Sequence, residues 1–147
     1  MSGRAARSSP SSAGAAEQGG PLQATPKATT EWIRSLRAPK PSFDPWVPQA
    51  VQIEDERARD GSTASVGTVF ITNRECPFTC LMCDLWKYTT DESVPVGAVD
   101  RQVESALAQM GAISQVKLYN AGNFFDDRAV APPDRERIAT RLGHLDA

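Results

Sequence analysis

The sequence predicts an α/β fold in which strands and helices alternate, and three observations support it. Residues 66–72 form a nearly continuous apolar run rich in β-branched and aromatic side chains, as buried parallel strands do. Residues 96–110 carry apolar side chains at intervals of three and four, which is typical of an amphipathic helix. An alternating strand at 115–120 precedes a helix at 135–142 that prolines open and a glycine ends. Together these elements give two consecutive β/α units.

The first 29 residues predict a disordered tail. Residues 1–29 consist mainly of Ser, Ala, Gly, Pro and Gln without periodicity, so they cannot bury enough apolar surface to offset the entropy lost on ordering. The start of the tail is rich in arginine and poor in acids, which leaves an organelle transit peptide open. It lacks the apolar segment of a secretory signal.

Residues 30–65 predict a preface to the main domain. Residues 30–37 combine a capping-type threonine with apolar residues at helical spacing, so we expect a short amphipathic helix that prolines end. Residues 51–54 alternate apolar and polar side chains, as a half-exposed strand does. We expect this strand to pair with 66–72 as a hairpin, and residues 66–147 to form the main domain.

Composition narrows the classes of partner. The chain has 147 residues, a formal net charge of −2 and a pI near 5.4, which give no electrostatic case for nucleic-acid binding by this portion. No run of roughly 18 apolar residues occurs, which predicts no membrane span. Clustered cysteines fit a reducing compartment, so we expect a cytoplasmic protein.

All three cysteines lie in one short stretch that follows the apolar strand. Cys76, Cys80 and Cys83 have the spacing CxxxCxxC. The stretch comes directly after the carboxyl end of that strand, which is where α/β folds build their sites. Three thiolates so close together can converge on one inorganic centre. A [4Fe–4S] cluster normally takes four protein thiols, so three leave one iron open to another ligand.

Three other interpretations of the cysteines stay open. The same positions share one face of a helix, where cysteine packs as a small hydrophobe, although Pro77, Thr79 and Asp84 interrupt that face. Zinc prefers four ligands, and here Asp84 would have to complete the set because His144 is distant and unpaired. A disulfide framework needs an even number of cysteines and an extracellular context. The spacing favours an iron–sulfur cluster over zinc and over structural or redox thiols.

The CxxxCxxC pattern resembles the radical S-adenosylmethionine (SAM) superfamily. The resemblance implies that Cys76, Cys80 and Cys83 bind the [4Fe–4S] cluster and that SAM chelates the open iron through its amino and carboxylate groups. It also implies a low-potential electron donor of the flavodoxin or ferredoxin type, cleavage of SAM and a 5′-deoxyadenosyl radical. The fold implied is the amino-terminal portion of a partial (β/α) barrel of the radical SAM type, preceded by the disordered tail.

The resemblance further implies residues that contact SAM. In the superfamily, a glycine-rich turn after the second barrel strand contacts the SAM amino group. Asn120, Ala121, Gly122 and Asn123 occupy that place here, without the family's glutamate, so the two asparagines and nearby backbone carbonyls are the candidates. The residue before the third cysteine often packs by the adenine, and in this sequence it is Met82.

A longer set of strings is similar to a narrower group, the radical SAM subunit of archaeosine synthase and its bacterial relatives within the Elongator-type class. The strings are TNRECP at 72–77, CDLW at 83–86 and KLYNAGNFFD at 117–126. This resemblance covers residues 66–130 and implies transfer RNA or a modified base as substrate.

The length of the chain limits the barrel. A complete barrel needs roughly 200 residues or more, and residues 66–147 suffice for only two β/α units. We therefore expect an amino-terminal piece of a longer enzyme, catalytically incomplete and prone to aggregate through uncovered sheet edge and helix faces.

Overall fold

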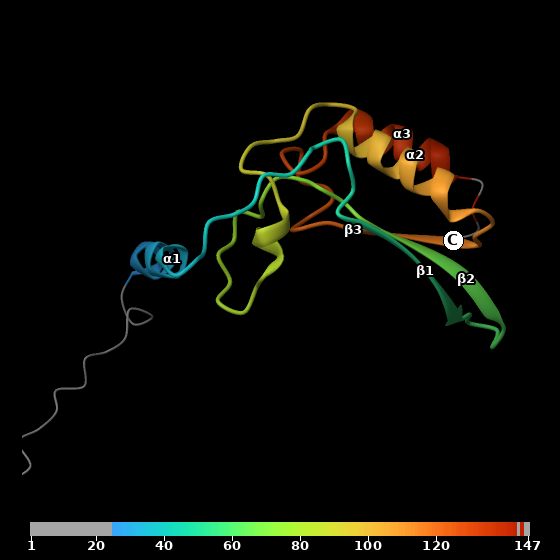
Figure 1. Ribbon diagram of the computed structural model, residues 1–147, viewed down its shortest axis with the longest axis horizontal. Helices are drawn as coiled ribbons and strands as arrows, with labels where there is room; N and C mark the ends of the chain where they lie inside the picture. The colour runs from blue at the N-terminus through green and yellow to red at the C-terminus, as the bar shows by residue number, and fades with distance from the viewer. Residues whose placement is uncertain (1–24, 144, 146–147) are drawn as a thin grey trace, which may run out of the picture. The chain divides into compact units, whose positions relative to one another are not determined.

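The computed structural model describes residues 25–143 and 145 (Figure 1). Residues 1–24 of the predicted tail and His144 lie outside the described residues. In chain order the elements are α1 (Pro26–Ser35), β1 (Ala50–Arg57), β2 (Thr63–Phe70), the 3-10 helix η2 (Leu85–Tyr88), α2 (Ala98–Met110), β3 (Gln115–Tyr119) and α3 (Pro132–Leu142). The predicted α/β class is confirmed. The described strands form one three-stranded sheet, and the partial barrel stays a prediction.

α1 begins earlier than the sequence predicted. The side chain of Thr25 accepts a hydrogen bond from a backbone N–H of the first turn at 3.2 Å, and Pro26 occupies the start of the helix, where its missing N–H has no cost. Residues 25–29, which composition had placed in the tail, are therefore the cap and first turn of α1. This helix lies in a unit that ends at Leu36, and the chain after it forms a second unit.

The sheet has the order β1-β2-β3. β1 and β2 form the predicted hairpin in antiparallel register, with Ala50 opposite Phe70, and Gly61 supplies the positive φ of +88° in their turn. β3 joins the other edge of β2 in parallel and places Tyr119 opposite Phe70. Because β2 and β3 run the same way, their carboxyl ends meet at one end of the sheet.

α2 and α3 cover one face of this sheet (Figure 1). Val69 of β2 is fully buried there, and it shares a core with Val99 and Val103 of α2 and with Ile138 of α3; Leu118 of β3 packs against this core. Each such side chain stabilises the fold by roughly 1.5–3 kcal/mol through burial. None of the helices in the described part of the chain has the length and apolar character needed to cross a membrane.

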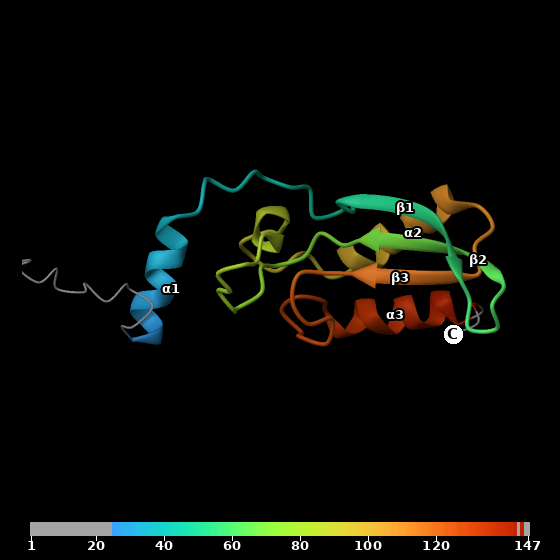
Figure 2. The same cartoon turned by 90° about the horizontal axis from the view of Figure 1, so that it is seen from below.

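The opposite face of the sheet has neither α2 nor α3 over it (Figure 2). Phe70, Lys117 and Tyr119 lie on this face because side chains alternate along a strand. The rings of Phe70 and Tyr119 stack with centroids 5.5 Å apart. Lys117 forms an ion pair with Glu56 of β1, and the hydrogen bond from Lys117 to that carboxylate raises the pKa of the lysine.

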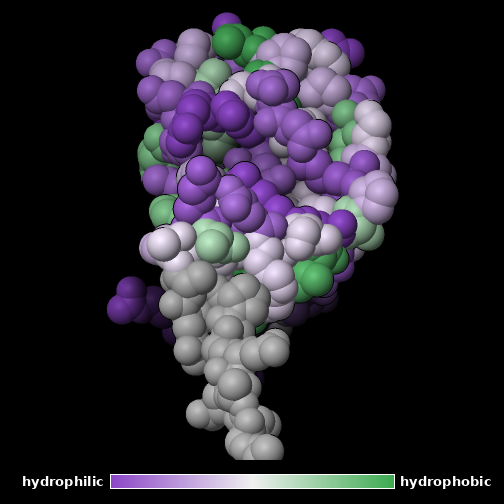
Figure 3. All heavy atoms as spheres, turned by 90° about the vertical axis from the view of Figure 1, so that its left-hand side faces the viewer, coloured by the Kyte–Doolittle hydropathy of each residue, from purple (hydrophilic) through white to green (hydrophobic). Residues whose placement is uncertain are grey.

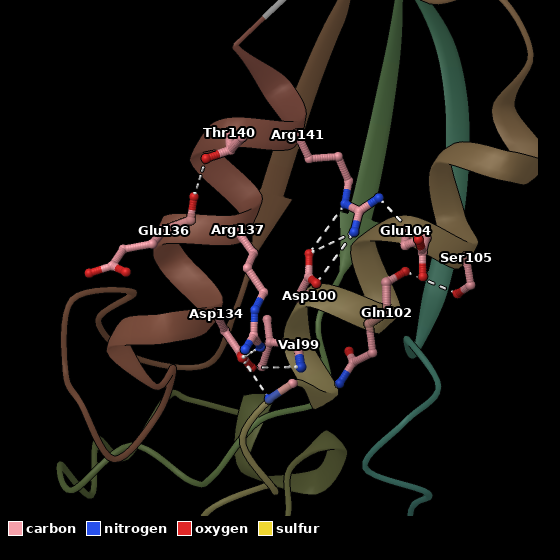
Figure 4. Close-up of polar contacts among 11 residues, drawn as sticks. Val99, Asp100, Gln102, Glu104, Ser105, Asp134, Glu136, Arg137, Thr140 and Arg141 are labelled. Atoms are coloured by element: carbon pink, nitrogen blue, oxygen red, sulfur yellow. Dashed lines mark hydrogen bonds and ion pairs between the residues drawn. The ribbon is translucent and has the colours of Figure 1, made fainter.

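A buried carboxylate joins the two helices (Figure 4). Asp134, at the start of α3, accepts hydrogen bonds from the backbone N–H groups of Gly97 at 2.6 Å and Val99 at 3.1 Å. The first N–H groups of a helix have no partner within the helix, and glycine at the N-cap of α2 has no side chain to supply one, so Asp134 caps α2 from another element. Near the end of α3, Arg141 pairs with Asp100 of α2 at 3.1 Å.

We expect Asp134→Ala to lower the free energy of unfolding by about 1–3 kcal/mol, because it removes the cap of α2 and leaves buried N–H groups without partners. Urea unfolding followed by circular dichroism measures the change. Glu136→Ala, on an exposed position of the same helix, is the control and should change the value by less than about 0.5 kcal/mol. Equal losses in the two variants would contradict this role for Asp134.

Candidate metal centre

The cysteine loop leaves the carboxyl end of β2 and runs as turns and irregular backbone to η2. Cys76 and Cys83 are half-buried, Cys80 is exposed, and all three are free thiols. Since no helix spans these positions, the alternative in which the cysteines form one helical face is wrong. The loop is instead free to direct more than one thiol toward a common point.

The thiols are not gathered into a ligand set as the loop stands. Among the described residues, no group of three or more His, Cys, Asp and Glu side chains lies close enough to hold a metal ion. Phe78 and Leu81, two apolar residues of the same loop, are 74% and 57% exposed, and Met82 is 88% exposed. Figure 3 shows hydrophilic and hydrophobic residues interspersed on the side of the molecule toward which the loop projects. Metal binding would have to draw the loop closed.

One part of the predicted site is assembled, namely the contact between the glycine turn and the first cysteine. Gly122 has a φ of +100°, which favours glycine, and a Cβ added there would lie 3.2 Å from Cβ and 3.4 Å from Sγ of Cys76. The absence of a side chain thus lets the turn after β3 lie directly against Cys76. The family resemblance implied a role for this turn in binding SAM, and the structure brings Gly122 and Cys76 into contact.

The buried amide of Asn73 holds these two segments in place. Its Nδ2 donates to the carbonyl of Ala121 at 3.0 Å, and its Oδ1 accepts from the N–H of Ala121 at 3.1 Å. Asn73 is completely buried, so neither group competes with water for these bonds. The pair fixes the chain before Cys76 relative to the turn that contains Gly122.

Gln102 of α2 fixes the preceding residue of the same segment. Its Oε1 accepts from the N–H of Thr72 at 2.8 Å, and its Nε2 donates to the Thr72 carbonyl at 2.9 Å and to the Pro45 carbonyl at 2.7 Å. Thr72 lies beyond the end of β2, and the Gln102 side chain supplies the hydrogen bonds that a neighbouring strand would otherwise make to its backbone. Neither Gln102 nor Asn73 was predicted as a site residue from the sequence. The one signal available was an uncharged polar pair, Thr72 and Asn73, directly after a buried apolar strand.

Glu75 ties the cysteine loop to the chain before β1. Its carboxylate accepts from Arg37 at 2.7 Å and from Lys40 at 3.1 Å, and the Arg37 guanidinium lies 4.6 Å from the ring centroid of Trp86. Burial raises the pKa of Glu75, but the hydrogen bonds from Arg37 and Lys40 outweigh it, so the pKa lies below its ordinary value. Glu75 is therefore held as a carboxylate directly before Cys76.

The four residues of the predicted SAM-binding turn divide between two hollows. Gly122 and Asn123 line a small one, of about 50 Å³, together with Cys76. Asn120 lines a larger cavity of about 420 Å³ on the uncovered face of the sheet, and Ala121 lines both. Met82 lines neither hollow. Asn120 therefore lines a different hollow from Gly122 and Asn123, and Ala121 is the residue common to both hollows.

Asp84, the oxygen ligand considered for zinc, is exposed and pairs with Lys87 at 2.9 Å. An ion pair this exposed contributes little to stability, so it would not prevent a change of partner. Its position after Cys83 nevertheless directs the carboxylate toward η2 in the described structure.

We expect Gly122→Ala to destabilise the protein more than Gly61→Ala. Both glycines have a positive φ, which costs a residue with a Cβ roughly 1–2 kcal/mol, but a Cβ at Gly61 meets no atom within 4 Å whereas one at Gly122 meets Cys76. The additional loss at Gly122 should be about 1 kcal/mol, measured by urea unfolding of the reduced protein. Identical losses for both variants would rule out the close contact with Cys76.

Comparison of the chain with models of protein families, with curated proteins and with solved structures finds no match. The arrangement of the chain's own residues is therefore the support for any functional proposal.

Proposed function

We propose that this chain is the cluster-bearing part of a radical SAM enzyme. Cys76, Cys80 and Cys83 would bind three irons of a [4Fe–4S] cluster and leave the fourth iron to SAM. When bound, the two groups together supply a 5′-deoxyadenosyl radical that abstracts hydrogen from a substrate. The chain's own task is to hold the ligands, orient SAM and limit the access of water.

The observation that carries the proposal is the approach of the glycine turn to Cys76. Gly122, whose φ of +100° favours glycine, lies directly against Cys76 at the carboxyl ends of two parallel strands, and both residues line a hollow of about 50 Å³. A structural thiol packed in a core needs no such space. The exposed Cys80 and half-buried Cys83 lie on a loop without regular structure, which suits closure around a cluster.

The turn also offers suitable groups for the amino end of SAM. The SAM ammonium is a hydrogen-bond donor, so it requires oxygen acceptors, and Ala121 and Asn123, which carry such oxygens, are among the residues that line the hollow with Cys76. The Oδ1 of Asn123 already accepts from the N–H of Phe125 at 3.0 Å, which fixes the orientation of its amide. Met82 would reach the adenine only after the loop closes, because its side chain is exposed.

The proposed partners follow from the sequence resemblances to the radical SAM superfamily and to the archaeosine synthase group. We propose a flavodoxin- or ferredoxin-type electron donor and, as substrate, transfer RNA or a modified base, in the cytoplasm. The net charge of −2 supplies no attraction to phosphates, so contacts with an RNA backbone would have to come from another polypeptide segment.

Anaerobic reconstitution with ferrous iron and sulfide tests the metal. We expect a brown protein that absorbs near about 400 nm, as thiolate-bound iron–sulfur clusters do, with about four irons per chain. Cys76→Ala, Cys80→Ala and Cys83→Ala should each remove most of the iron, and Thr79→Ala, within the same loop, should retain it. A colourless protein that binds one zinc per chain would support the structural zinc module with Asp84 instead. Unchanged iron content without the three cysteines would refute both.

SAM binding tests the turn separately from the cluster. We expect Asn123→Ala to leave the iron content unchanged and to weaken SAM about tenfold, the loss of one hydrogen bond to a charged group. Equilibrium dialysis of the reconstituted protein measures the dissociation constant. Gln109→Ala, an exposed change on α2, is the control. Equal affinity in all three proteins would remove Asn123 from the site.

A further inference from the structure

A second hollow lies beside the cysteine loop, on the face of the sheet that α2 and α3 leave uncovered (Figure 2). This cavity of about 420 Å³ is lined by Phe70 and Tyr119 at the carboxyl ends of β2 and β3, and by Leu85 and Tyr88 of η2. Its volume is within the range of small-molecule sites. The proposed cluster and SAM do not account for it, since their hollow is lined by Cys76 and the glycine turn.

The lining of the cavity is aromatic and uncharged. The residues that line it, among those the structure describes, are Gln49, Ala50, Gln52, Phe70, Ile71, Leu85, Tyr88, Tyr119, Asn120 and Ala121. None of these side chains carries a carboxylate, ammonium, guanidinium or imidazole group. An ion placed here would gain no oppositely charged partner from the lining, whereas an uncharged ligand needs none. The lining therefore selects an uncharged ligand.

Large apolar side chains are left open at this cavity. Tyr88 and Tyr119 are each 53% exposed and Leu85 is 55% exposed, although all three line the same hollow. Aromatic side chains such as these bind flat rings by stacking or edge contacts. The Phe70 and Tyr119 rings lie within 17° of parallel, so this wall of the cavity is already ordered.

One polar atom of a residue that lines the cavity has no hydrogen-bond partner. The Nδ2 of Asn120 is buried and makes no hydrogen bond in the described structure. By contrast, the side-chain amide of Gln49 is engaged, because its Nε2 donates to Oγ1 of Thr72 at 2.8 Å. A buried N–H donor without an acceptor is unfavourable, and a rotation of the Asn120 side chain toward the cavity would let a ligand acceptor satisfy it.

We infer that this cavity binds an uncharged aromatic ring that carries a hydrogen-bond acceptor, and that the acceptor pairs with Nδ2 of Asn120. Binding of this ligand requires neither the cluster nor SAM. Ala121 lines both hollows, so the ring would lie next to the Cys76 region; to identify it as the substrate rests on the proposed function, whereas the binding itself does not.

The experiment uses three ligands of one shape and different charge on the metal-free protein without SAM. Benzamide is neutral and has a carbonyl acceptor, benzoate is its anionic analogue and benzamidine its cationic analogue. Titration of backbone amide resonances by nuclear magnetic resonance measures each dissociation constant. We expect benzamide to bind with a constant on the order of a millimolar, and both charged analogues at least about tenfold more weakly.

A charge exchange at Asn120 then tests the acceptor. Asn120→Asp keeps the shape of the side chain but replaces the donor by a carboxylate, so benzamide should weaken about tenfold and benzamidine should become the tightest of the three. Gln109→Glu makes the same chemical change at an exposed position of α2 and should leave the order unaltered. No binding by the wild-type protein, or equal binding of all three ligands, overturns the inference whatever the variants do.

The outcome is separable from that of the proposed function. Ring binding with no iron uptake would leave the cavity assigned and remove the radical chemistry. Iron uptake and SAM binding with no preference for benzamide would do the reverse.

Discussion

The buried amide of Asn73 is the interaction on which the candidate site depends. β2 ends at Phe70 and β3 ends at Tyr119. Beyond these residues the two segments of backbone would separate if no other interaction joined them. The two hydrogen bonds between the Asn73 side chain and the backbone of Ala121 continue the pairing past the last strand residues. Since the pair is sealed from water, its loss would leave backbone groups unsatisfied, so the connection is rigid.

The connection through Asn73 lies between two hollows whose linings differ in charge. On one side lies the glycine turn with Cys76, next to the ionised Glu75 and to Arg74 and Arg128. On the other side lies a larger space with aromatic walls and no charge. The charged groups and the Cys76 thiol are thus kept apart from the uncharged space by a single turn of backbone. Among the described residues that line the two hollows, only Ala121 is common to both.

Local patterns in the sequence predicted most of the fold because they report periodicity. The apolar spacing of α2, the alternation in β3 and the hairpin of β1 with β2 each arise from residues near one another in the chain, so all were found. The predicted start of α1 was wrong because residues up to 29 were assigned to the tail from their composition, whereas Thr25 and Pro26 form a capping sequence. Pro77, Thr79 and Asp84 interrupt the helical face that the cysteines would share, and no helix forms at residues 76–83.

The interactions that hold the site in place could not be predicted in this way. Asn73 pairs with a residue 48 positions away, Gln102 with one 30 positions away, and Asp134 caps a helix 37 positions before it. Each is an ordinary polar residue in the sequence, and its partner is set only by how the elements pack. The cysteine spacing leads to a metal hypothesis, which stays a prediction, because metal ligands often lie close together in the sequence. By contrast, the cavity at Asn120 combines β1, β2, η2 and the end of β3, which no local pattern reports.

The direction of β1 has a consequence for the architecture. β1 is antiparallel to β2, and in the described residues β3 pairs only with β2. One edge strand of the sheet, β1, is therefore antiparallel to its neighbour, and the other edge strand, β3, is parallel to its neighbour. Any further β/α unit that preserved a parallel array would have to add beside β3, because a parallel strand set against β1 would oppose β2. The sheet would then extend at the β3 edge alone. Cys76, which follows β2, would lie after the first strand of the parallel array and not after a central one.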